Sequence, residues 1–467
     1  MSIDLTLDRI QRLADHLPAY TRPTCHIAGT NGKGSVSALV SSMLSSSTPP
    51  LSVGRFNSPH LVSVNDCIAI NNASVTSEVY EKARAEVERA DKEHGIGVSS
   101  FELLTLTALL IFEEAKLDVV VLEVGMGGRL DATNIIADEC ILVSALTAVD
   151  LDHQAVLGAS VSAIAAEKAA IARKGTPFVL GSQPHPEVEA VVASVVTAAE
   201  AELLYALPVL PREWDAALDG PSSPPFALSG TPFTPPPPLP VRFSMPCFEH
   251  PVTALLPLHG EHQLDNLALA VSIVSAVLMH PAWTTARARF TPAAIADGIR
   301  RVAWPGRLSF HPLNTPRLLV LADGAHNPGS ARTLAAYLSE LLVGARPLAL
   351  TFILALSHSP PKTPRETLAP LFAAAALGQA DVSVALLRFT PPEGMPWVRA
   401  VPPVELQAVV ESLAPDAKIW VDENNADGPG ALHRALDWAA ELNRKRDQLV
   451  VLAGSLYLVA DFYRLGL

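Results

Sequence analysis

A glycine-rich segment that directly follows a short apolar run constrains this chain more than any other feature. Residues 24–28 are apolar enough for a buried strand, residues 29–35 (GTNGKGS) follow, and a helical pattern then extends to Leu44. Closely spaced glycines let backbone N–H groups converge on phosphate oxygens, Lys33 adds positive charge, and a helix start adds its positive end. The segment therefore predicts a strand, a phosphate-binding loop and a helix.

Two positions of this loop depart from the usual pattern. That pattern has a glycine five residues before the Gly-Lys pair, where this chain has Ile27, and a Ser or Thr directly after the lysine, where Gly34 intervenes. A flexible glycine-rich turn between a strand and a helix is the alternative interpretation.

Composition narrows the class of protein. The 467 residues, 49% of them hydrophobic, suffice for two or three domains with their own cores. Lys and Arg number 34 against 47 Asp and Glu, a net charge of -13, which excludes a strongly positive surface for nucleic acid or anionic lipid. Four widely separated cysteines argue against a zinc site or a disulfide framework and favour a reducing compartment.

The N-terminal residues MSIDL carry an acid at once and lack the features of a secretion signal or a mitochondrial presequence. No stretch is expected to reach the apolar length of a transmembrane helix. We therefore expect a cytoplasmic protein, a monomer, whose partners are small molecules and neither nucleic acid nor a membrane.

Apolar strand-like runs alternate with helical patterns along most of the chain, which predicts an α/β fold with parallel sheets covered on both faces. In the first half the strand-like runs are residues 24–28, 117–124, 141–147 and 177–181, with helices at 35–44 and 160–172. In the second half they are 318–321, 348–354, 382–387, 419–422 and 449–452, with helices at 331–342, 405–413, 431–442 and 456–465. The boundary falls near residues 300–307, so we predict domains 1–303 and 304–467, the second Rossmann-like.

Residues 207–240 are rich in proline and include TPPPP at 234–238. Proline removes backbone hydrogen bonding, so we interpret this stretch as a surface insertion or mobile loop without a catalytic role. A polyproline ligand for a partner domain is the alternative.

Two further motifs carry metal-binding residue types. Glu123 ends an apolar strand before the run GMGGRLDATN, and ligands of open α/β sheets bind at such strand ends. Mg²⁺ keeps several waters, so one or two carboxylates suffice. His153 follows another strand, and Lys168 lies on the next helix. The alternatives are an ion pair or cap for Glu123, a surface or core role for His153, and a solvated helix face for Lys168.

The second half contributes Arg307, in the sequence WPGR at the predicted domain junction, and DGAHNP at 323–328, which contains Asp323 and His326. An arginine near a linker can clamp phosphate charge when domains close. An interdomain salt bridge and a plain turn are the alternative.

These motifs and their order resemble the dihydrofolate synthase and folylpolyglutamate synthase family, within the Mur-type amide ligases. The matching segments are 29–35, 57–62, 101–105, 122–134, 151–153, 167–169, 262–263, 304–307, 323–327 and 454–457, which leaves only the proline-rich stretch outside. Residues 3–10 and 393–397 resemble fungal-type dihydrofolate synthases in particular.

The resemblance implies ATP and Mg²⁺ as cofactors and assigns residues to each ligand. Those for ATP are Thr30, Asn31, Gly32, Lys33, Gly34, Ser35, Asn266, Arg307 and Asp323. Those for the metal are Ser58, Glu123, His153 and a carbamylated Lys168. Those for the pteroate are Ser2, Ile3, Asp4, Leu5, Phe101, Leu130, Asp131 and Ala132. Two positions depart from the family pattern: Asn57 stands where Thr or Ser is usual, and Ala170 replaces a glycine.

The reaction that the resemblance implies is ATP-dependent addition of L-glutamate to 7,8-dihydropteroate through an acyl phosphate. Its catalytic residues would be Lys33, Lys168, Arg307 and His326, with ATP and pteroate bound by residues 1–303 and glutamate by residues 304–467. The alternatives are a folylpolyglutamate synthase, which extends folate tails by the same chemistry, and a nucleotide-binding regulator without ligase activity.

Overall fold

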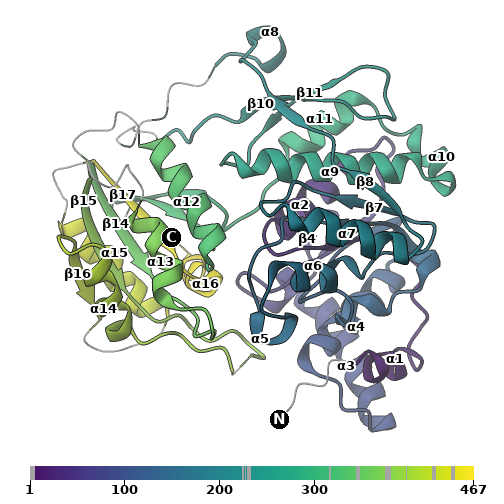
Figure 1. Cartoon of the computed structure of the whole chain (residues 1–467), viewed down its shortest axis with the longest axis horizontal. Coiled ribbons are helices and arrows are strands. Elements are labelled where there is room, and N and C mark those ends of the chain that lie inside the picture. The colour runs from purple at the N-terminus through teal and green to yellow at the C-terminus, as the bar shows by residue number, and fades with distance from the viewer. Residues whose placement is uncertain are drawn as a thin grey trace. The chain divides into compact units, whose positions relative to one another are not determined.

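The computed structural model describes residues 6–222, 226, 228, 233–314, 317–342, 348–373, 380–395, 397–422, 428–442 and 447–466. The chain folds into two compact units (Figure 1). The first comprises Met1–Asp215, Leu239–Pro257 and Gln263–Ala303, and the second comprises Ala216–Pro238, Leu258–His262 and Trp304–Leu467. Residues 216–238 and 258–262, which we had placed in the first domain, therefore group with the second unit.

The first unit contains an eight-stranded sheet with the order β4-β3-β2-β5-β1-β6-β7-β8. Its strands are β1 (Thr24–Ala28), β2 (Val53–Phe56), β3 (Ile68–Ile70), β4 (Ala73–Ser74), β5 (Val119–Glu123), β6 (Ile141–Leu146), β7 (Pro177–Leu180) and β8 (Glu202–Tyr205). The pairs from β2 to β8 are parallel, and β3 and β4 are antiparallel additions at one edge. The central strands β1, β5 and β6 are buried along their whole length, as expected for parallel strands covered on both faces.

Helices cover this sheet and complete the unit. They are α1 (Asp8–Ala14), α2 (Lys33–Leu44), α3 (Ser77–His94), α4 (Ser100–Glu114), α5 (Gln154–Leu157), α6 (Val161–Ala169), α7 (Glu187–Ala198), α9 (His262–Met279), α10 (Thr284–Arg287) and α11 (Pro292–Arg300). Helix α11 packs directly on α2: a Cβ at Gly298 would lie 2.7 Å from Met43 Cα, so only glycine permits this approach. A separate antiparallel sheet, of order β11-β10-β9, consists of β9 (Val209–Pro211), β10 (Leu239–Phe243) and β11 (Val252–Leu256).

Helix α9 corrects one expectation. We predicted no stretch of transmembrane length, yet this helix has 18 residues with a mean hydropathy of 1.4, enough by length and composition to cross a membrane. Of that window, 78% is buried inside the protein. A helix that is apolar on all sides suits the core of a large domain, so α9 owes its composition to the neighbours that surround it.

The second unit contains a six-stranded sheet with the order β12-β13-β17-β14-β15-β16, in which only β12 is antiparallel to its neighbour. Its strands are β12 (Ser309–Asn314), β13 (Arg317–Ala322), β14 (Leu348–Leu354), β15 (Ala380–Leu386), β16 (Lys418–Val421) and β17 (Asp447–Ala453). Its helices are α8 (Ala216–Asp219), α12 (Pro328–Leu341), α13 (Pro364–Phe372), α14 (Pro403–Leu413), α15 (Pro429–Leu442) and α16 (Leu456–Arg464). The predicted α/β fold is thus confirmed in both units.

The proline-rich stretch lies at the surface in part, as expected, with Leu210 and Leu218 60% and 65% exposed, but three of its apolar side chains pack on a core. Phe226 and Phe233 lie with their ring centroids 5.7 and 5.9 Å from that of Phe310 on β12. Together with Leu228 they pack against the core beneath α12. These apolar side chains explain why this part of the stretch groups with the second unit.

Candidate active site

The loop after β1 is held in one shape by contacts that only glycine permits. Gly29 and Gly32 have φ values of 147° and 93°, and a Cβ at either position would collide with the side chain of Thr147 or Asn266, respectively. The backbone N–H groups of Thr30 and Asn31 both donate to the carbonyl of Ala148, at 3.0 and 3.1 Å. The loop is therefore anchored to the segment after β6, unlike a freely flexible turn.

Helix α2 begins at this loop with its first amides uncapped by a side chain, because the N-cap residue is Gly32. Lys33, its first residue, is half-buried and folds back over the loop. Its Nζ donates to the carbonyls of Gly29 and Thr30, at 3.1 and 3.2 Å. Amides without a side-chain cap, a helix start and an ammonium at one point are the donor set that a phosphate group needs.

A buried carboxylate faces the same lysine. Glu123, the last residue of β5, is 5% exposed, and its Oε1 lies 3.8 Å from Lys33 Nζ. Asn57 Nδ2 donates to Glu123 Oε2 at 2.6 Å, and Ser58 follows it, half-buried, in the loop after β2. The Asn57 amide therefore orients the carboxylate predicted to bind a metal.

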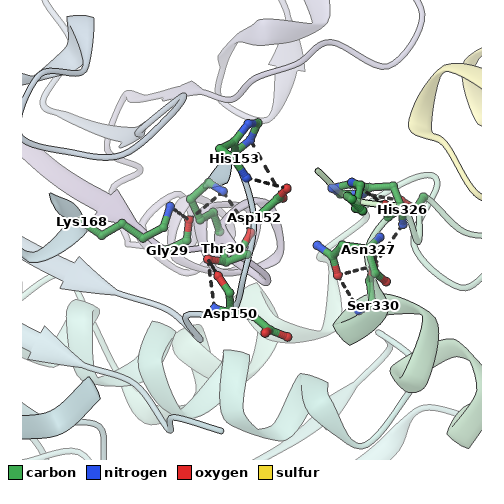
Figure 2. Close-up of polar contacts among 12 residues, drawn as sticks. Gly29, Thr30, Asp150, Asp152, His153, Lys168, His326, Asn327 and Ser330 are labelled. Carbon is green, nitrogen blue, oxygen red and sulfur yellow. Dashed lines mark hydrogen bonds and ion pairs between the residues drawn. The ribbon is translucent and has the colours of Figure 1, made fainter. Parts of the chain in front are cut away.

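Lys168, in the last turn of α6, also reaches the loop, where its side chain points toward Gly29 (Figure 2). It is only 3% exposed, and its Nζ donates to the carbonyl of Gly29 at 2.8 Å. Burial, followed by the neighbouring charge of Lys33, lowers the pKa of Lys168 to about 7. The alternative of a solvated helix face is therefore wrong for this residue, which points into the protein.

His153, unlike these buried groups, is exposed at the protein surface. It has a left-handed φ of 50° at the start of α5, and its Nε2 lies 4.0 Å from Asp152 Oδ2. Across the part of the chain that the structure describes, no three His, Cys, Asp or Glu side chains gather in a group that could hold a metal ion. The predicted metal set of Ser58, Glu123, His153 and Lys168 therefore stays a prediction.

Asn266 and its helical neighbour Gln263 bring α9 to the same loop. Asn266 Nδ2 donates to Gln263 Oε1 at 2.9 Å, and Gln263 Nε2 donates to Ser35 Oγ at 3.4 Å. Because the bare Cα of Gly32 faces the Asn266 amide, the structure places this predicted nucleotide residue directly beside the loop.

The residues predicted to bind the pteroate fall into two groups. Ser2, Ile3, Asp4 and Leu5 lie outside the described residues. Phe101, near the start of α4, is half-buried and packs its ring against Gly125 and Phe56, the latter at 6.3 Å between ring centroids. Leu130 is half-buried and Ala132 is buried in the segment after β5.

Asp131 has a structural role that the sequence did not indicate. Its carboxylate accepts hydrogen bonds from Thr133 N at 3.0 Å, from Thr133 Oγ1 at 2.6 Å and from Met126 N at 2.8 Å. Burial raises the pKa of Asp131, and these donors oppose that effect. Its described hydrogen bonds close the turn of residues 125–131, and its predicted role as a polar anchor for a ligand stays a prediction.

In the second unit Asp323 follows β13 and organises its own loop. Its carboxylate accepts from Leu308 N at 2.9 Å and from Ala325 N at 2.8 Å. Arg307, half-buried, donates from Nη1 to the carbonyl of Gly306 at 3.0 Å. Burial raises the pKa of Asp323, and Arg307 opposes the rise, so the two predicted nucleotide residues belong to one local cluster.

His326 lies exposed at the start of α12, where Asn327 caps the helix (Figure 2). His326 Nδ1 lies 2.9 Å from the Gly324 carbonyl, and Lys362 Nζ donates to the His326 carbonyl at 2.9 Å. These residues border a pocket at the carboxyl end of β14, where ligands of such sheets bind. The pocket is lined by His326, Leu356, Ser357, His358, Ser359, Lys362, Thr363, Pro364, Thr367 and Val401.

Several of these contacts could not have been found by examining motifs. Lys362 lies in a loop whose sequence carries no recognisable pattern, and the fold alone brings it to His326. Asn57 and Gln263 lie inside segments that carry the family resemblance, so the sequence pointed to their positions, although it assigned them no role.

Comparison with known proteins identifies the family. Residues 306–465 match the family described as dihydrofolate synthetase, C-terminal domain. The dihydrofolate synthetase of Saccharomyces cerevisiae is 34% identical over 473 residues, covering 100% of this chain and 98% of the yeast protein. The probable dihydrofolate synthetase of Schizosaccharomyces pombe is 28% identical over 471 residues, covering 99% of both chains.

Solved structures agree with this likeness. Folylpolyglutamate synthase of Mycobacterium tuberculosis, complexed with ADP and AMPPCP, superposes with a TM-score of 0.76 at 28% identity, covering 98% of this chain and 95% of that one. FolC of E. coli, in complex with DHPP and ADP, gives a TM-score of 0.75 at 27% identity, covering 100% and 94%. The full-length likeness to a relative at 34% identity shows that this chain belongs to the dihydrofolate synthetase family.

Proposed function

We propose that this enzyme uses ATP to join L-glutamate to 7,8-dihydropteroate, giving dihydrofolate, ADP and phosphate. The observation that carries the proposal is the convergence of Lys33, Lys168 and Glu123 on an anchored, uncapped glycine loop. A phosphate site alone needs neither a second lysine that is buried, as Lys168 is, nor a buried carboxylate. The relatives named dihydrofolate synthetase support the same acceptor.

The chemistry requires an activated acid. A carboxylate resists attack by an amine, so the γ-phosphoryl group of ATP passes to the acceptor carboxylate and forms an acyl phosphate with a good leaving group. The glutamate amine then attacks the acyl carbon, and the tetrahedral intermediate collapses to an amide with release of phosphate. The protein's task is to position the reactants and to neutralise phosphate charge, as is usual in phosphoryl transfer.

The residues of the first unit fit the nucleotide and a divalent metal. The uncapped start of α2 and Lys33 would hold the phosphates, with Asn266 beside them. Glu123 supplies the hard oxygen ligand that Mg²⁺ prefers, and we propose Ser58, His153 and a modified Lys168 as its companions. Bound Mg²⁺ would offset phosphate charge. A solved relative with Mn, AMPPNP and L-glutamate bound supports a nucleotide and a divalent metal.

The second unit would contribute to nucleotide and glutamate binding. We propose Arg307 and Asp323 as nucleotide residues and the pocket beside His326 as the glutamate site. Lys362 and the two histidines of this pocket, together with its hydroxyl groups, suit a dicarboxylic amino acid.

Lys168 is expected to carry a carbamate. Its neutral amine would attack CO₂ at carbon and release one proton, converting an ammonium that repels a metal into an anion with two oxygen donors. Because its pKa is about 7, the reactive neutral form prevails above pH 7 and the ammonium below it. Occupancy should therefore fall as the pH is lowered from 8 to 6.

The measurement is ¹³C NMR of the protein in ¹³C-bicarbonate. A carbamate resonance that weakens at low pH and vanishes in Lys168→Ala is expected, while Lys92→Met, at an exposed position, keeps it. An unmodified side chain, with activity retained in Lys168→Ala, would contradict the carbamate.

The proposed reaction is tested by phosphate release. Release should require ATP, dihydropteroate and glutamate together, and 7,8-dihydropteroate should give a kcat/KM at least about tenfold above that of tetrahydrofolate. A glutamylated folate presents its carboxylate further from the ring and carries extra negative charge, so its use would demand more space and another cation. Equal or better use of tetrahydrofolate would instead indicate a folylpolyglutamate synthase. Nucleotide binding without turnover would indicate a regulator.

A further inference from the structure

A hydrogen-bonded chain runs through the buried interior of the first unit, from β1 to the turn after β5. His26, in the middle of β1, is 0% exposed, and its Nε2 lies 2.8 Å from Thr133 Oγ1. The Thr133 hydroxyl lies 2.6 Å from Asp131 Oδ1. Asp131 Oδ2 accepts from Met126 N at 2.8 Å, so the chain ends in the turn of residues 125–131.

A histidine is an unexpected residue at this position. Strand β1 lies between β5 and β6 in the centre of a parallel sheet, where apolar residues usually stand. A buried polar ring costs free energy unless it forms hydrogen bonds. Burial, followed by the charge of Arg173, lowers the pKa of His26 to about 3, so the ring is neutral. A valine would fill this position in the core equally well. The histidine differs from it by forming the contact with Thr133.

The number of available protons determines which residue donates in each hydrogen bond of this series from His26 to Asp131. A neutral histidine carries one N–H, a threonine one O–H and an ionised carboxylate none. With the proton on Nε2, His26 donates to Thr133 and Thr133 donates to Asp131, so both contacts are hydrogen bonds. With the proton on Nδ1, that N–H would be buried without an acceptor among the described residues, and the single threonine hydrogen would have to serve two neighbours.

We propose that His26 is a positioning residue for the acceptor site: through the Thr133 hydroxyl it orients the Asp131 carboxylate, and Asp131 holds the turn of residues 125–131 in place. This turn lies against Phe101, because a Cβ at Gly125 would collide with the phenylalanine ring. The inference rests on the proposed function and on the pteroate site at Phe101 and residues 130–132 that the family resemblance implies. Because His26 is fully buried in β1, its proposed effect on the dihydropteroate is transmitted through the turn.

Three variants test this role. Thr133→Val keeps the shape of the side chain and removes the hydroxyl that links His26 to Asp131. Thr133→Ser keeps the hydroxyl. Ser144→Ala is the matched control, since Ser144 pairs with His26 across β1 and β6 and donates to the Ile171 carbonyl at 2.8 Å, outside the chain.

Thr133→Val should raise the KM for dihydropteroate about tenfold, with kcat and the KM for ATP within about twofold of the parent enzyme. Thr133→Ser should restore the KM to within about threefold, and Ser144→Ala should leave it unchanged. A general loss of stability would not separate the two KM values. An unchanged KM for dihydropteroate in Thr133→Val, or an equal rise in the KM for ATP, would overturn the proposal.

A second measurement applies to the unaltered protein and does not depend on any variant being active. In ¹⁵N-histidine-labelled protein, His26, assigned by the signal lost in His26→Gln, should be neutral between pH 6 and 8 with its proton on Nε2. A proton on Nδ1 would refute the proposed order of donation, from His26 to Thr133 and from Thr133 to Asp131. Failure of the proposed function can be told apart from failure of this positioning role, because the parent enzyme would then show no phosphate release dependent on dihydropteroate.

Discussion

Replacing Lys33 with methionine should lower kcat/KM for ligation by at least about 100-fold. The change removes the ammonium at the start of α2 and keeps the aliphatic stem that packs on the loop. Because the ammonium is only half-buried and contacts two loop carbonyls, the melting temperature should change by less than about 5 °C. Initial rates at varied ATP and thermal melting without nucleotide provide the two measurements.

Lys92→Met, on the exposed last turn of α3, is the control for loss of one positive charge. It should have parental kinetics and stability. The phosphate-loop interpretation would be wrong if Lys33→Met melted far below the parent and yet kept substantial activity per folded molecule.

Glu123→Gln is expected to raise the Mg²⁺ concentration that gives half-maximal activity at least about tenfold. The amide keeps the shape of the side chain and can still bond Asn57, but it lacks the negative charge that a hard cation requires. Excess Mg²⁺ should restore part of the rate, since the weakened site can still be filled. A titration of initial rate against Mg²⁺ at saturating ATP measures the effect.

The control for this change is Glu189→Gln, at an exposed position in α7, whose titration should superimpose on that of the parent. If Glu123→Gln also had a parental titration, Glu123 would not be a metal ligand. A fall in rate that no Mg²⁺ concentration relieves would also count against direct coordination.

Much of the fold was predictable from local pattern. The runs at β1, β5, β6, β13, β14 and β17 are mostly apolar, which is typical of strands buried on both faces, and the structure places a strand at each. The starting positions of helices were harder to predict. A helix was expected from residue 35, but α2 begins at Lys33, inside the loop, because the left-handed conformation of Gly32 decides where it can start. Strands β3 and β4, at one end of the sheet, are three and two residues long, which is too short to leave a pattern in the sequence.

The candidate site was predictable in its residue types and only in part in its geometry. The loop, Glu123 and Lys168 were identified from motifs, and the structure brings them together. Asp131 was identified as well, but its described hydrogen bonds go to the turn around it. Lys362 reaches His326 only because β13 and β14 end at the same edge of one sheet, a proximity that a linear pattern does not encode.

The sequence alone was enough to predict the alternation of strands and helices, a glycine-rich loop and the family, because each depends on residues that are neighbours along the chain or on motifs in a set order. Tertiary structure alone decided that Lys168 is buried against Gly29 and loses part of its basicity there. It also decided that Phe226 and Phe233 join the second core and that a histidine within a buried strand reaches Asp131. The physical reason is that burial and hydrogen-bond geometry arise between residues far apart in the chain, and charge and pKa follow from those surroundings.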